Sequence, residues 1–356
     1  MDHENTIGKE VFHNMDSHKL VATAHSHLMQ RWKANELMGL IPTVYSQPIG
    51  VQLEITYRCN LKCSHCYNES GFPSMDKFKE ELSEQQWLDI AEELVEIGVF
   101  SAIISGGEPF LNASLVFRMA EVFSAAGIKM GIITNGWFLS DEVAAQLASF
   151  KKVINWVQVS VDAADQTTHD AIRGVPGSFE HCVRAIIRLR ENGIPVKMAT
   201  AVMKENQHQL DHLFDLALFL GVETLHIGNI INIGSARKAD TSRQWRDACL
   251  RKLVKLKEKY SAVMEIMISM DACLSVQFFC KYRLNNVYII RPNGELKLDC
   301  TVPTIFGRYR KRGDLANLWS EVGLDTAYEN HAVQQIIATI ARDDGFQNIL
   351  DVHLSR

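Results

Sequence analysis

Six short apolar segments separated by helical patterns constrain the fold of this chain more than any other feature. Each segment is mostly apolar along its length, which is typical of strands that are buried on both faces of a sheet. Strands that alternate with helices in this way form a parallel sheet with right-handed crossovers. The six expected strands are Val51–Thr56, Ser101–Ser105, Met130–Thr134, Trp156–Val161, Val196–Val202 and Thr224–Ile230.

Two of the intervening helices carry start and stop signals. Ser83 and Gln86 form the capping-box pattern S-x-x-Q, and Gly98 provides a stop after an apolar stripe. We expect a second helix to open at Asn206 with the pattern N-x-x-Q and to end at Gly221. These signals favour helices on the segments between the strands.

Length and composition fit one large α/β domain with a smaller one. The 356 residues are 47% hydrophobic, which is enough to bury a sizeable core. No apolar run is long enough to cross a membrane and the N-terminus lacks the order of a signal peptide, so we expect a cytoplasmic protein without a membrane partner. A net charge of −5 gives no signal for nucleic-acid binding. The eight cysteines favour metal binding under reducing conditions over a disulfide framework.

Cys59, Cys63 and Cys66 stand in a C-x3-C-x2-C run directly after the first expected strand. Three thiolates this close can ligate one metal centre, but a tetrahedral zinc site needs a fourth ligand and no obvious one lies beside them. A [4Fe–4S] cluster normally takes four cysteines, so three would leave one iron open to bind and reduce another molecule. The alternative is three unrelated cysteines in a loop.

Small and polar residues stand at the carboxyl ends of the next strands. Two glycines before Glu108 let the backbone approach a ligand closely, and Pro109 fixes the exit of the chain. Asn135 and Asp162 stand at the ends of the third and fourth strands, and each alone also fits a plain turn or a helix cap. Arg173, in the segment H-D-x-x-R-G, offers a bidentate donor for a carboxylate or, as the alternative, a surface salt bridge.

With these motifs, the chain resembles the radical S-adenosylmethionine (radical SAM) superfamily. The resemblance covers about residues 50–233 and rests on the cysteine run, with His65 before its third cysteine, and on the segments G-G-E-P, T-N-G and H-D-x-x-R-G. It implies a (β/α)6 partial barrel whose strand C-termini face the active site. It also implies a [4Fe–4S] cluster on Cys59, Cys63 and Cys66, with S-adenosyl-L-methionine (AdoMet) chelated by the open iron. The residues that it assigns to AdoMet are His65, Gly106, Gly107, Glu108, Pro109, Asn135, Ser160, Asp162 and Arg173.

We expect three parts in the chain: a helical extension over residues 1–49, the barrel over 50–262 and a small α+β domain over 263–356. The last part contains a hairpin turn at Pro292-Asn293-Gly294 between two apolar strands. A hairpin flanked by cysteines resembles the SPASM/Twitch extension, which holds auxiliary Fe–S clusters in peptide-modifying radical SAM enzymes.

The cysteines of this last part depart from the SPASM pattern, because no C-x2-C group follows the hairpin. Two alternatives stay open, one incompletely ligated auxiliary Fe–S cluster or buried thiols without metal. The cysteines concerned are Cys273, Cys280 and Cys300. Cys182 and Cys249 lie within helical patterns, and we expect them in the core.

Three functions are compatible with the sequence. The resemblance favours a radical SAM enzyme that cleaves AdoMet reductively to a 5′-deoxyadenosyl radical and abstracts hydrogen from a ribosomally made peptide, to form a crosslink, a thioether or an epimer. The second is a radical SAM enzyme that acts on a small molecule in cofactor, haem or secondary-metabolite biosynthesis. The third is a non-catalytic Fe–S protein that binds a partner or senses redox state, and the strand-end motifs speak against it.

The resemblance also implies partners. An electron donor such as flavodoxin or ferredoxin would reduce the cluster. Residues 1–49 are too few for the winged-helix leader-peptide reader of many maturases, so a separate leader-binding protein or the C-terminal domain would recognise a peptide substrate. The sequence identifies no catalytic acid or base.

Overall fold

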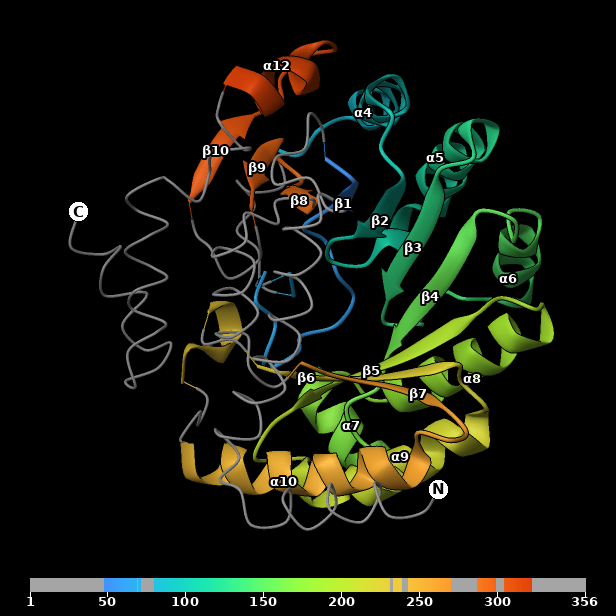
Figure 1. Cartoon of the computed structure of the whole chain (residues 1–356), viewed down its shortest axis with the longest axis vertical. Coiled ribbons are helices and arrows are strands. Elements are labelled where there is room, and N and C mark those ends of the chain that lie inside the picture. Colours follow the sequence, from blue (N-terminus) through green and yellow to red (C-terminus); the bar gives the residue numbers. More distant parts are fainter. Residues whose placement is uncertain are drawn as a thin grey trace, which may run out of the picture.

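The computed structural model describes residues 48–68, 70–71, 80–230, 233–238, 243–269, 287–298 and 304–321. Within these ranges the strands form one sheet in the order β10-β9-β8-β1-β2-β3-β4-β5-β6-β7 (Figure 1). The strands are β1 (Gly50–Glu54), β2 (Ser101–Ser105), β3 (Lys129–Thr134), β4 (Ile154–Ser160), β5 (Val196–Val202), β6 (Thr224–Asn229), β7 (Glu265–Ser269), β8 (Val287–Ile290), β9 (Glu295–Lys297) and β10 (Ile305–Arg308). The α-helices are α4 (Glu84–Ile97), α5 (Ala113–Ala126), α6 (Asp141–Ala148), α7 (Gln166–Arg173), α8 (Ser178–Glu191), α9 (Leu210–Leu220), α10 (Arg243–Tyr260) and α12 (Asp314–Glu321).

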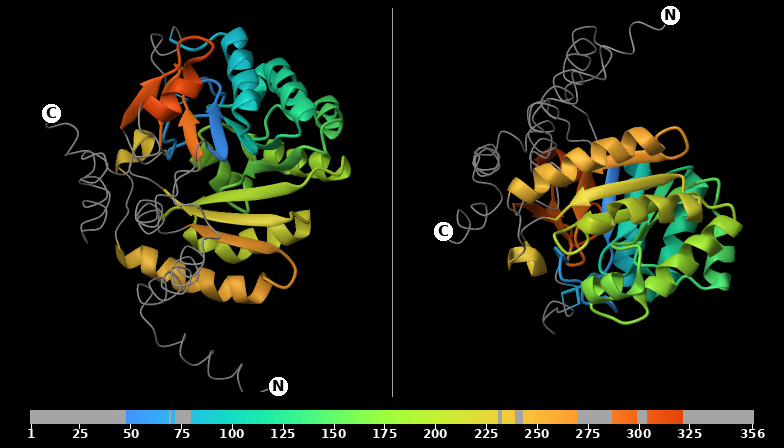
Figure 2. Two further views of the ribbon diagram at one scale, coloured as in Figure 1. Left: turned by 45° about the horizontal axis from the view of Figure 1, so that its top comes forward. Right: turned by 90° about the horizontal axis from the view of Figure 1, so that it is seen from below.

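Strands β1 to β7 pair in parallel, each with the next along the chain. The sheet curves, and helices α4, α5, α6, α8 and α9 cover its outer face (Figures 1 and 2). This arrangement confirms the expected (β/α)6 partial barrel, to which β7 adds a seventh parallel strand. The ends of the six expected strands differ from the observed ones by no more than two residues.

Alternate residues of each strand face the helices and the inside of the curve, as the two-residue repeat of a strand requires. On β4, Val157 and Val159 are completely buried in the core that the sheet shares with the helices. Trp156, Gln158 and Ser160 point the other way and are only half-buried. On β4, the face inside the curve is therefore more polar than the face that packs on the helices. This inner face extends to the carboxyl end of the strand.

Helix α4 begins and ends as its sequence predicts. The Ser83 hydroxyl accepts a hydrogen bond from the backbone N–H of Gln86 at 3.3 Å, and the Gln86 side chain accepts one from the backbone N–H of Ser83 at 3.0 Å. Gly98 ends the helix in the left-handed conformation, with φ of 83°. The capping box is confirmed.

The helix expected to open at Asn206 begins later. A 3₁₀ turn, η2 (Gln207–Gln209), comes first, and α9 starts at Leu210. The Asn206 side chain does not cap the helix, because it donates to the carbonyl oxygens of Asp162 (2.7 Å) and Ala201 (2.8 Å) instead. Asn206 is completely buried, so this link between the ends of β4 and β5 replaces the expected cap.

The hairpin in the C-terminal third extends the sheet of the barrel. Strands β8 and β9 are antiparallel, and Gly294 in the turn between them has a φ of 83°. Strand β8 pairs in parallel with β1, with Gly50 opposite Val287. The hairpin prediction is confirmed. The limits of the three parts of the chain stay predictions, and residues 1–47 lie outside the described part.

Residues 304–321 pack onto α4 through a buried carboxylate. Glu93 accepts hydrogen bonds from the Tyr309 hydroxyl and the Leu315 backbone N–H, both at 3.1 Å.

Cys182 and Cys249 are buried, as expected. Within the described ranges, every helix is too short or too polar to cross a lipid bilayer.

Candidate active site

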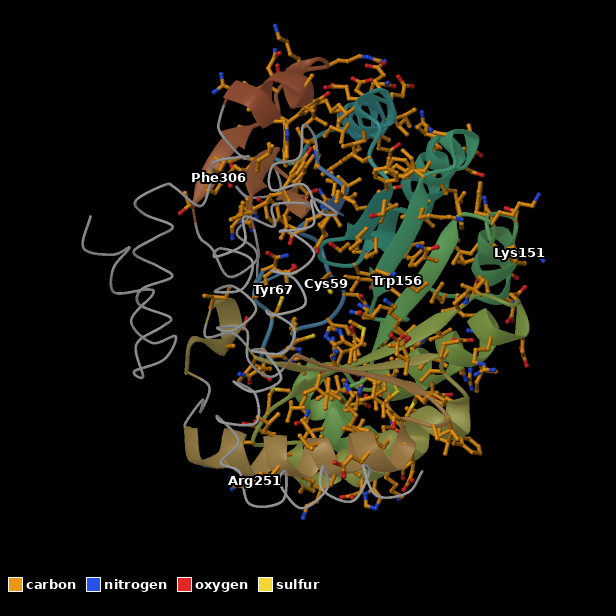
Figure 3. All side chains as sticks on the ribbon, viewed as in Figure 1. Cys59, Tyr67, Lys151, Trp156, Arg251 and Phe306 are labelled. Atoms are coloured by element: carbon orange, nitrogen blue, oxygen red, sulfur yellow. The ribbon has the colours of Figure 1, made fainter. Side chains whose placement is uncertain are left out.

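The three clustered cysteines lie in the loop that follows β1, inside the curve of the sheet, where Cys59 and Tyr67 are labelled in Figure 3. The end of β2 holds one side of this loop through backbone contacts. The Gly107 N–H donates to the Thr56 carbonyl oxygen at 2.7 Å, and the Glu108 N–H donates to the Arg58 carbonyl oxygen at 2.8 Å. A Cβ atom at Gly107 would lie 2.0 Å from the Arg58 oxygen. Only glycine therefore permits this approach of the two backbones.

The end of α7 holds the other side of the cysteine loop. The backbone N–H groups of Lys62 and Ser64, which flank Cys63, donate to the carbonyl oxygens of Arg173 (3.0 Å) and Ile172 (2.9 Å). Helix carbonyls in the last turn have no partner within the helix, so the loop satisfies them.

A third contact comes from the turn η3 (Gly234–Lys238). There the Ser235 N–H donates to the Cys66 carbonyl oxygen at 2.9 Å. The segment Gly234-Ser235-Ala236 after the sixth strand thus lies against the third cysteine.

Each of the three thiols accepts a hydrogen bond. The Cys59 sulfur accepts from the Leu61 N–H (3.4 Å) and the Asn135 side-chain amide (3.7 Å). The Cys66 sulfur accepts from the Ser70 N–H at 3.4 Å. Donors aimed at sulfur stabilise a thiolate, which is the form that binds metal.

The Cys63 sulfur accepts from the Arg173 guanidinium at 3.7 Å. Burial raises the pKa of Cys59 to about 12 and also raises that of Cys63. The Cys59 and Cys63 thiols of the metal-free chain are therefore protonated, and metal binding would have to displace their protons.

The donor set fits an iron–sulfur cluster better than a single metal ion. Among the described residues, no three His, Cys, Asp or Glu side chains lie close enough together to hold one ion. In a cubane cluster each cysteine binds a different iron, so its sulfurs need not converge on one point. Two buried nitrogens of the same loop, Asn60 Nδ2 and His65 Nδ1, have no hydrogen-bond partner within the described part of the chain. A polar ligand beside the cysteines would give them one.

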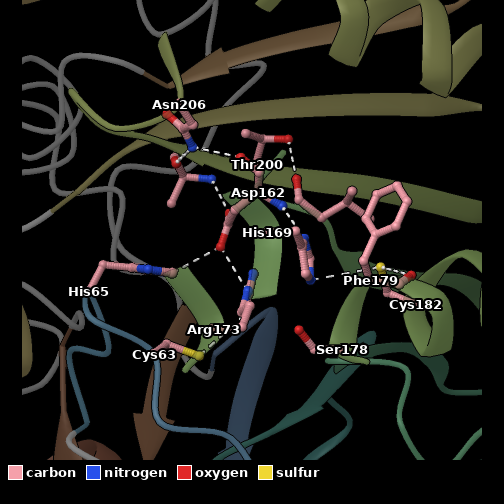
Figure 4. Close-up of polar contacts among 12 residues, drawn as sticks. Cys63, His65, Asp162, His169, Arg173, Ser178, Phe179, Cys182, Thr200 and Asn206 are labelled. Carbon is pink, nitrogen blue, oxygen red and sulfur yellow. Dashed lines mark hydrogen bonds and ion pairs between the residues drawn. The ribbon is translucent and has the colours of Figure 1, made fainter. Parts of the chain in front are cut away.

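Asp162 and Arg173 form a buried ion pair beside Cys63 (Figure 4). The Arg173 Nε lies 2.7 Å from Asp162 Oδ2, with side-chain exposures of 9% and 0%. Burial pushes the pKa of Asp162 upward, but the Arg173 charge holds that pKa below its usual range. Burial likewise tends to lower the pKa of Arg173, and Asp162 and Cys63 raise it. Both groups are therefore charged.

Two histidines complete the surroundings of Asp162. His65 Nε2 lies 3.5 Å from Asp162 Oδ2, and His169 Nδ1 accepts from the Asp162 backbone N–H at 3.1 Å. Burial lowers the pKa of both, that of His169 to about 4. Both imidazoles are thus neutral near pH 7, and Arg173 is the cation that balances Asp162.

Glu108 is completely buried, and its hydrogen-bond donors in the described part of the chain are uncharged. Its carboxylate accepts from the Thr134 hydroxyl (2.8 Å) and from the backbone N–H groups of Asn135 (2.8 Å) and Phe110 (3.1 Å). Burial raises the pKa of Glu108 to about 7. Glu108 thus ties the end of β2 to the end of β3.

The other expected site residues lie at the same end of the sheet. Gly106 (φ of 133°) and Pro109 flank the Glu108 segment, and Ser160 is the half-buried last residue of β4. The contacts of Glu108 and Asp162 are all with the chain itself, so the expected AdoMet contacts of these residues stay predictions. Cys273, Cys280 and Cys300 lie outside the described residues.

Sequence reasoning missed a polar group between β1 and the hairpin. Glu54, only 2% exposed, accepts from the Tyr67 hydroxyl at 2.8 Å, and its other oxygen lies 3.7 Å from Arg291 Nε. Arg291 also donates to the Asn68 side chain at 3.3 Å. The one available signal was a charged residue, Glu54, at the end of an apolar strand.

Residues 53–217 match the family model described as the radical SAM superfamily. The chain contains a radical SAM domain. The cofactors of this family are a [4Fe–4S] cluster and AdoMet, in agreement with the three cysteines.

Curated relatives share the radical SAM domain with this chain. Mycofactocin maturase MftC of Mycolicibacterium smegmatis is 38% identical over 181 residues, which are 51% of this chain and 44% of MftC. AdoMet-dependent heme synthase of Methanosarcina barkeri is 32% identical over 187 residues, 52% of each protein. The chain therefore spans about half the length of these relatives.

The fold agrees with that of a solved structure. Streptococcus suis SuiB bound to its precursor peptide SuiA has a TM-score of 0.64 and 16% identity, and the match covers 87% of this chain and 71% of SuiB. At this identity the likeness concerns the fold alone.

Proposed function

We propose that this chain is a radical SAM enzyme in which Cys59, Cys63 and Cys66 ligate a [4Fe–4S] cluster. The observation that carries the proposal is the cysteine loop, which backbone hydrogen bonds from the end of β2, the end of α7 and η3 hold in place. Its three thiols each accept a hydrogen bond, and two buried nitrogens of the same loop, Asn60 Nδ2 and His65 Nδ1, lack a hydrogen-bond partner among the described residues. A loop of unrelated cysteines would need none of these features.

When bound, the cluster and AdoMet supply a reductive cleavage whose product, after hydrogen is taken from a substrate, is 5′-deoxyadenosine. The chain's own residues would bind and orient AdoMet. We assign this contact to the His65 ring, the Asn135 amide and the carbonyl groups of Gly106 and Gly107. Pro109 and Ser160 would line the same place.

The charged members of the site would act as supports. Glu108 fixes the ends of β2 and β3 relative to each other, and the Asp162–Arg173 pair fixes α7 against β4. Any contact that these three residues make to AdoMet would come in addition to those roles. The burial of the loop would exclude water from the reacting groups.

We propose a ribosomally made peptide as the substrate, modified by a crosslink, a thioether or an epimerisation. The relatives named as maturases support this class, among them MftC and the sporulation killing factor maturation protein SkfB of Bacillus subtilis, which is 31% identical over 189 residues. An electron donor such as flavodoxin or ferredoxin and a separate leader-binding protein belong to the same proposal.

A small-molecule substrate is the second candidate, because heme synthase of Methanosarcina barkeri matches over a comparable stretch. Incubation with a candidate precursor peptide, chosen from any short reading frames beside the gene, separates the two. A mass decrease in that peptide, or deuterium taken up from heavy water where the product is an epimer, supports the first candidate. An unchanged peptide, with 5′-deoxyadenosine formed only when a small molecule is added, supports the second.

The test of the cluster is anaerobic reconstitution with iron and sulfide, followed by dithionite and AdoMet. We expect about four irons per chain and 5′-deoxyadenosine, with both lost in Cys59→Ala, Cys63→Ala and Cys66→Ala. Cys249→Ala, a buried cysteine of α10, is the matched control and should retain both. Iron binding without AdoMet cleavage in the wild type would instead favour a non-catalytic Fe–S protein.

The same iron count tests the auxiliary cluster. About six to eight irons per chain would support a second cluster on Cys273, Cys280 and Cys300. About four irons would leave those cysteines as thiols without metal.

A further inference from the structure

The donors to the three thiols differ in charge. Cys59 and Cys66 accept from backbone N–H groups and from the neutral Asn135 amide. Cys63 accepts from the guanidinium of Arg173, which is the one charged donor to a cysteine of the loop among the described residues. A positive charge at a ligand sulfur stabilises the reduced, more negative state of an iron–sulfur cluster.

The guanidinium is fixed from several directions. Its Nε lies against Asp162, and the Arg173 carbonyl oxygen accepts from the Lys62 N–H of the cysteine loop. Asp162 is held in turn, because its other carboxylate oxygen accepts from the Ala201 N–H at 2.9 Å. The Asn206 side chain anchors the Asp162 carbonyl oxygen at 2.7 Å. Arg173 therefore has little freedom to turn away from Cys63.

The other groups around the pair leave its charges in place. His65 and His169 face Asp162 as neutral rings, and the Cys182 thiol lies 3.9 Å from His169 Nε2. Arg173 contacts both the Cys63 sulfur and the Asp162 carboxylate, so the positive member of the pair is the one in contact with sulfur.

We propose that Arg173, held by Asp162, is a positioning residue that makes the cluster at Cys63 easier to reduce. This inference rests on the proposed function, because it needs a cluster on the three cysteines. It gives the H-D-x-x-R-G segment a role at the sulfur, in addition to any contact with AdoMet. It also explains why a charged pair is buried where two apolar side chains would cost less.

The test is a potentiometric titration of the reconstituted protein, followed by electron paramagnetic resonance, in the absence of AdoMet. Arg173→Met removes the positive charge, so the midpoint potential should shift to a more negative value. Asp162→Asn removes the negative charge but keeps a side-chain oxygen that can accept from Arg173 Nε, so the donor stays and the potential should shift the opposite way. Shifts of opposite sign, at an unchanged iron content, support the inference.

A double variant, Asp162→Asn with Arg173→Met, covers the case in which Arg173→Met does not fold. It removes both charges of the pair and leaves neither one unpaired. Because the positive charge is the one in contact with sulfur, the potential should still lie below that of the wild type. Arg184→Met is the matched control, because Arg184 pairs with Glu180 on the exposed side of α8. Its potential should equal that of the wild type.

The inference is overturned if the potential is unchanged in Arg173→Met, or in the double variant where Arg173→Met does not fold. Shifts of the same sign in Arg173→Met and Asp162→Asn would overturn it as well. A wild-type chain that binds no iron would instead remove the proposed function. The two failures are therefore distinguishable by the iron count of the wild type.

Discussion

Two of the three sides from which the cysteine loop is held use different chemistry. Toward β2 and β3 the contacts are uncharged: Gly107 permits backbone hydrogen bonds, and Glu108 accepts from neutral donors. Toward β4 and α7 the contact is charged: Arg173, paired with Asp162, donates to the Cys63 sulfur. Both carboxylates are completely buried, yet the pKa of Glu108 is raised to about 7 and that of Asp162 is lowered. A cation in contact, rather than the depth of burial, decides which carboxylate keeps its charge.

Removal of Asp162 should have the largest effect on stability. Asp162→Asn leaves the Arg173 guanidinium buried without a counter-charge, and loss of one partner of such a pair costs about 3–5 kcal/mol. Urea unfolding of the metal-free chain measures this. The double variant Asp162→Asn with Arg173→Met should recover most of the loss. A double variant as unstable as the single one would show that the pair is not the cause.

On the uncharged side, Glu108 should make the stability of the chain depend on pH. The pKa of Glu108 in the folded chain, about 7, lies above its ordinary value of 4.5, so the fold favours the neutral acid. The contribution of neutral Glu108 to the free energy of unfolding is fully present below pH 4.5. It is lost as the pH rises through 7, and the total loss is about 3 kcal/mol.

The measurement is the free energy of unfolding between pH 4.5 and 7.5, for the wild type and for Glu108→Gln. The variant has no group that titrates at this position, so its curve should lack this loss. Arg173 and Cys59 do not titrate in this range and leave the comparison clean. Parallel curves for the two chains would contradict the assignment to Glu108.

Gly107→Ala breaks the backbone contact on the uncharged side. The new Cβ meets the Arg58 carbonyl oxygen, and such overpacking costs about 1–3 kcal/mol because the loop must move. We expect reduced iron retention after reconstitution, since Arg58 adjoins Cys59.

Gly127→Ala is the control for that loss. Gly127 has a φ of 72° and open space around it, so this change strains only a helix end far from the cysteines. It should lower stability without loss of iron. Equal iron loss in both variants would argue against a specific contact at Gly107.

An exposed ion pair should contribute least. Glu180 and Arg184 lie 2.5 Å apart on α8 with side-chain exposures of 57% and 61%. Glu180→Gln should cost about 0.3–0.5 kcal/mol in urea unfolding, because water screens such pairs. A loss as large as that of Asp162→Asn would mean that burial does not set the difference.

The sequence predicted the parallel sheet and the strand ends well, because buried strands and helix stops leave local patterns. Cys59, Asn135 and Arg173 were placed at one end of that sheet for the same reason. The partners of the buried charges could not be predicted in this way. The Asp162–Arg173 contact and the Asn206 anchor depend on how three strand ends meet in space. The contact between Arg291 and Glu54 could not be predicted either, because these two residues lie far apart in the sequence.

Strand β1 has consequences for how the chain can fold during synthesis. It leads directly into the cysteine loop, and its two neighbours are β2, which follows soon after it, and β8, which belongs to the C-terminal third. Closing so long a loop is slow, and an unpaired strand edge invites aggregation until it is covered. A nascent or truncated chain that ends before β8 thus presents the cysteine loop on a sheet whose β1 edge is open. Such a chain is exposed to misassembly before iron can reach it.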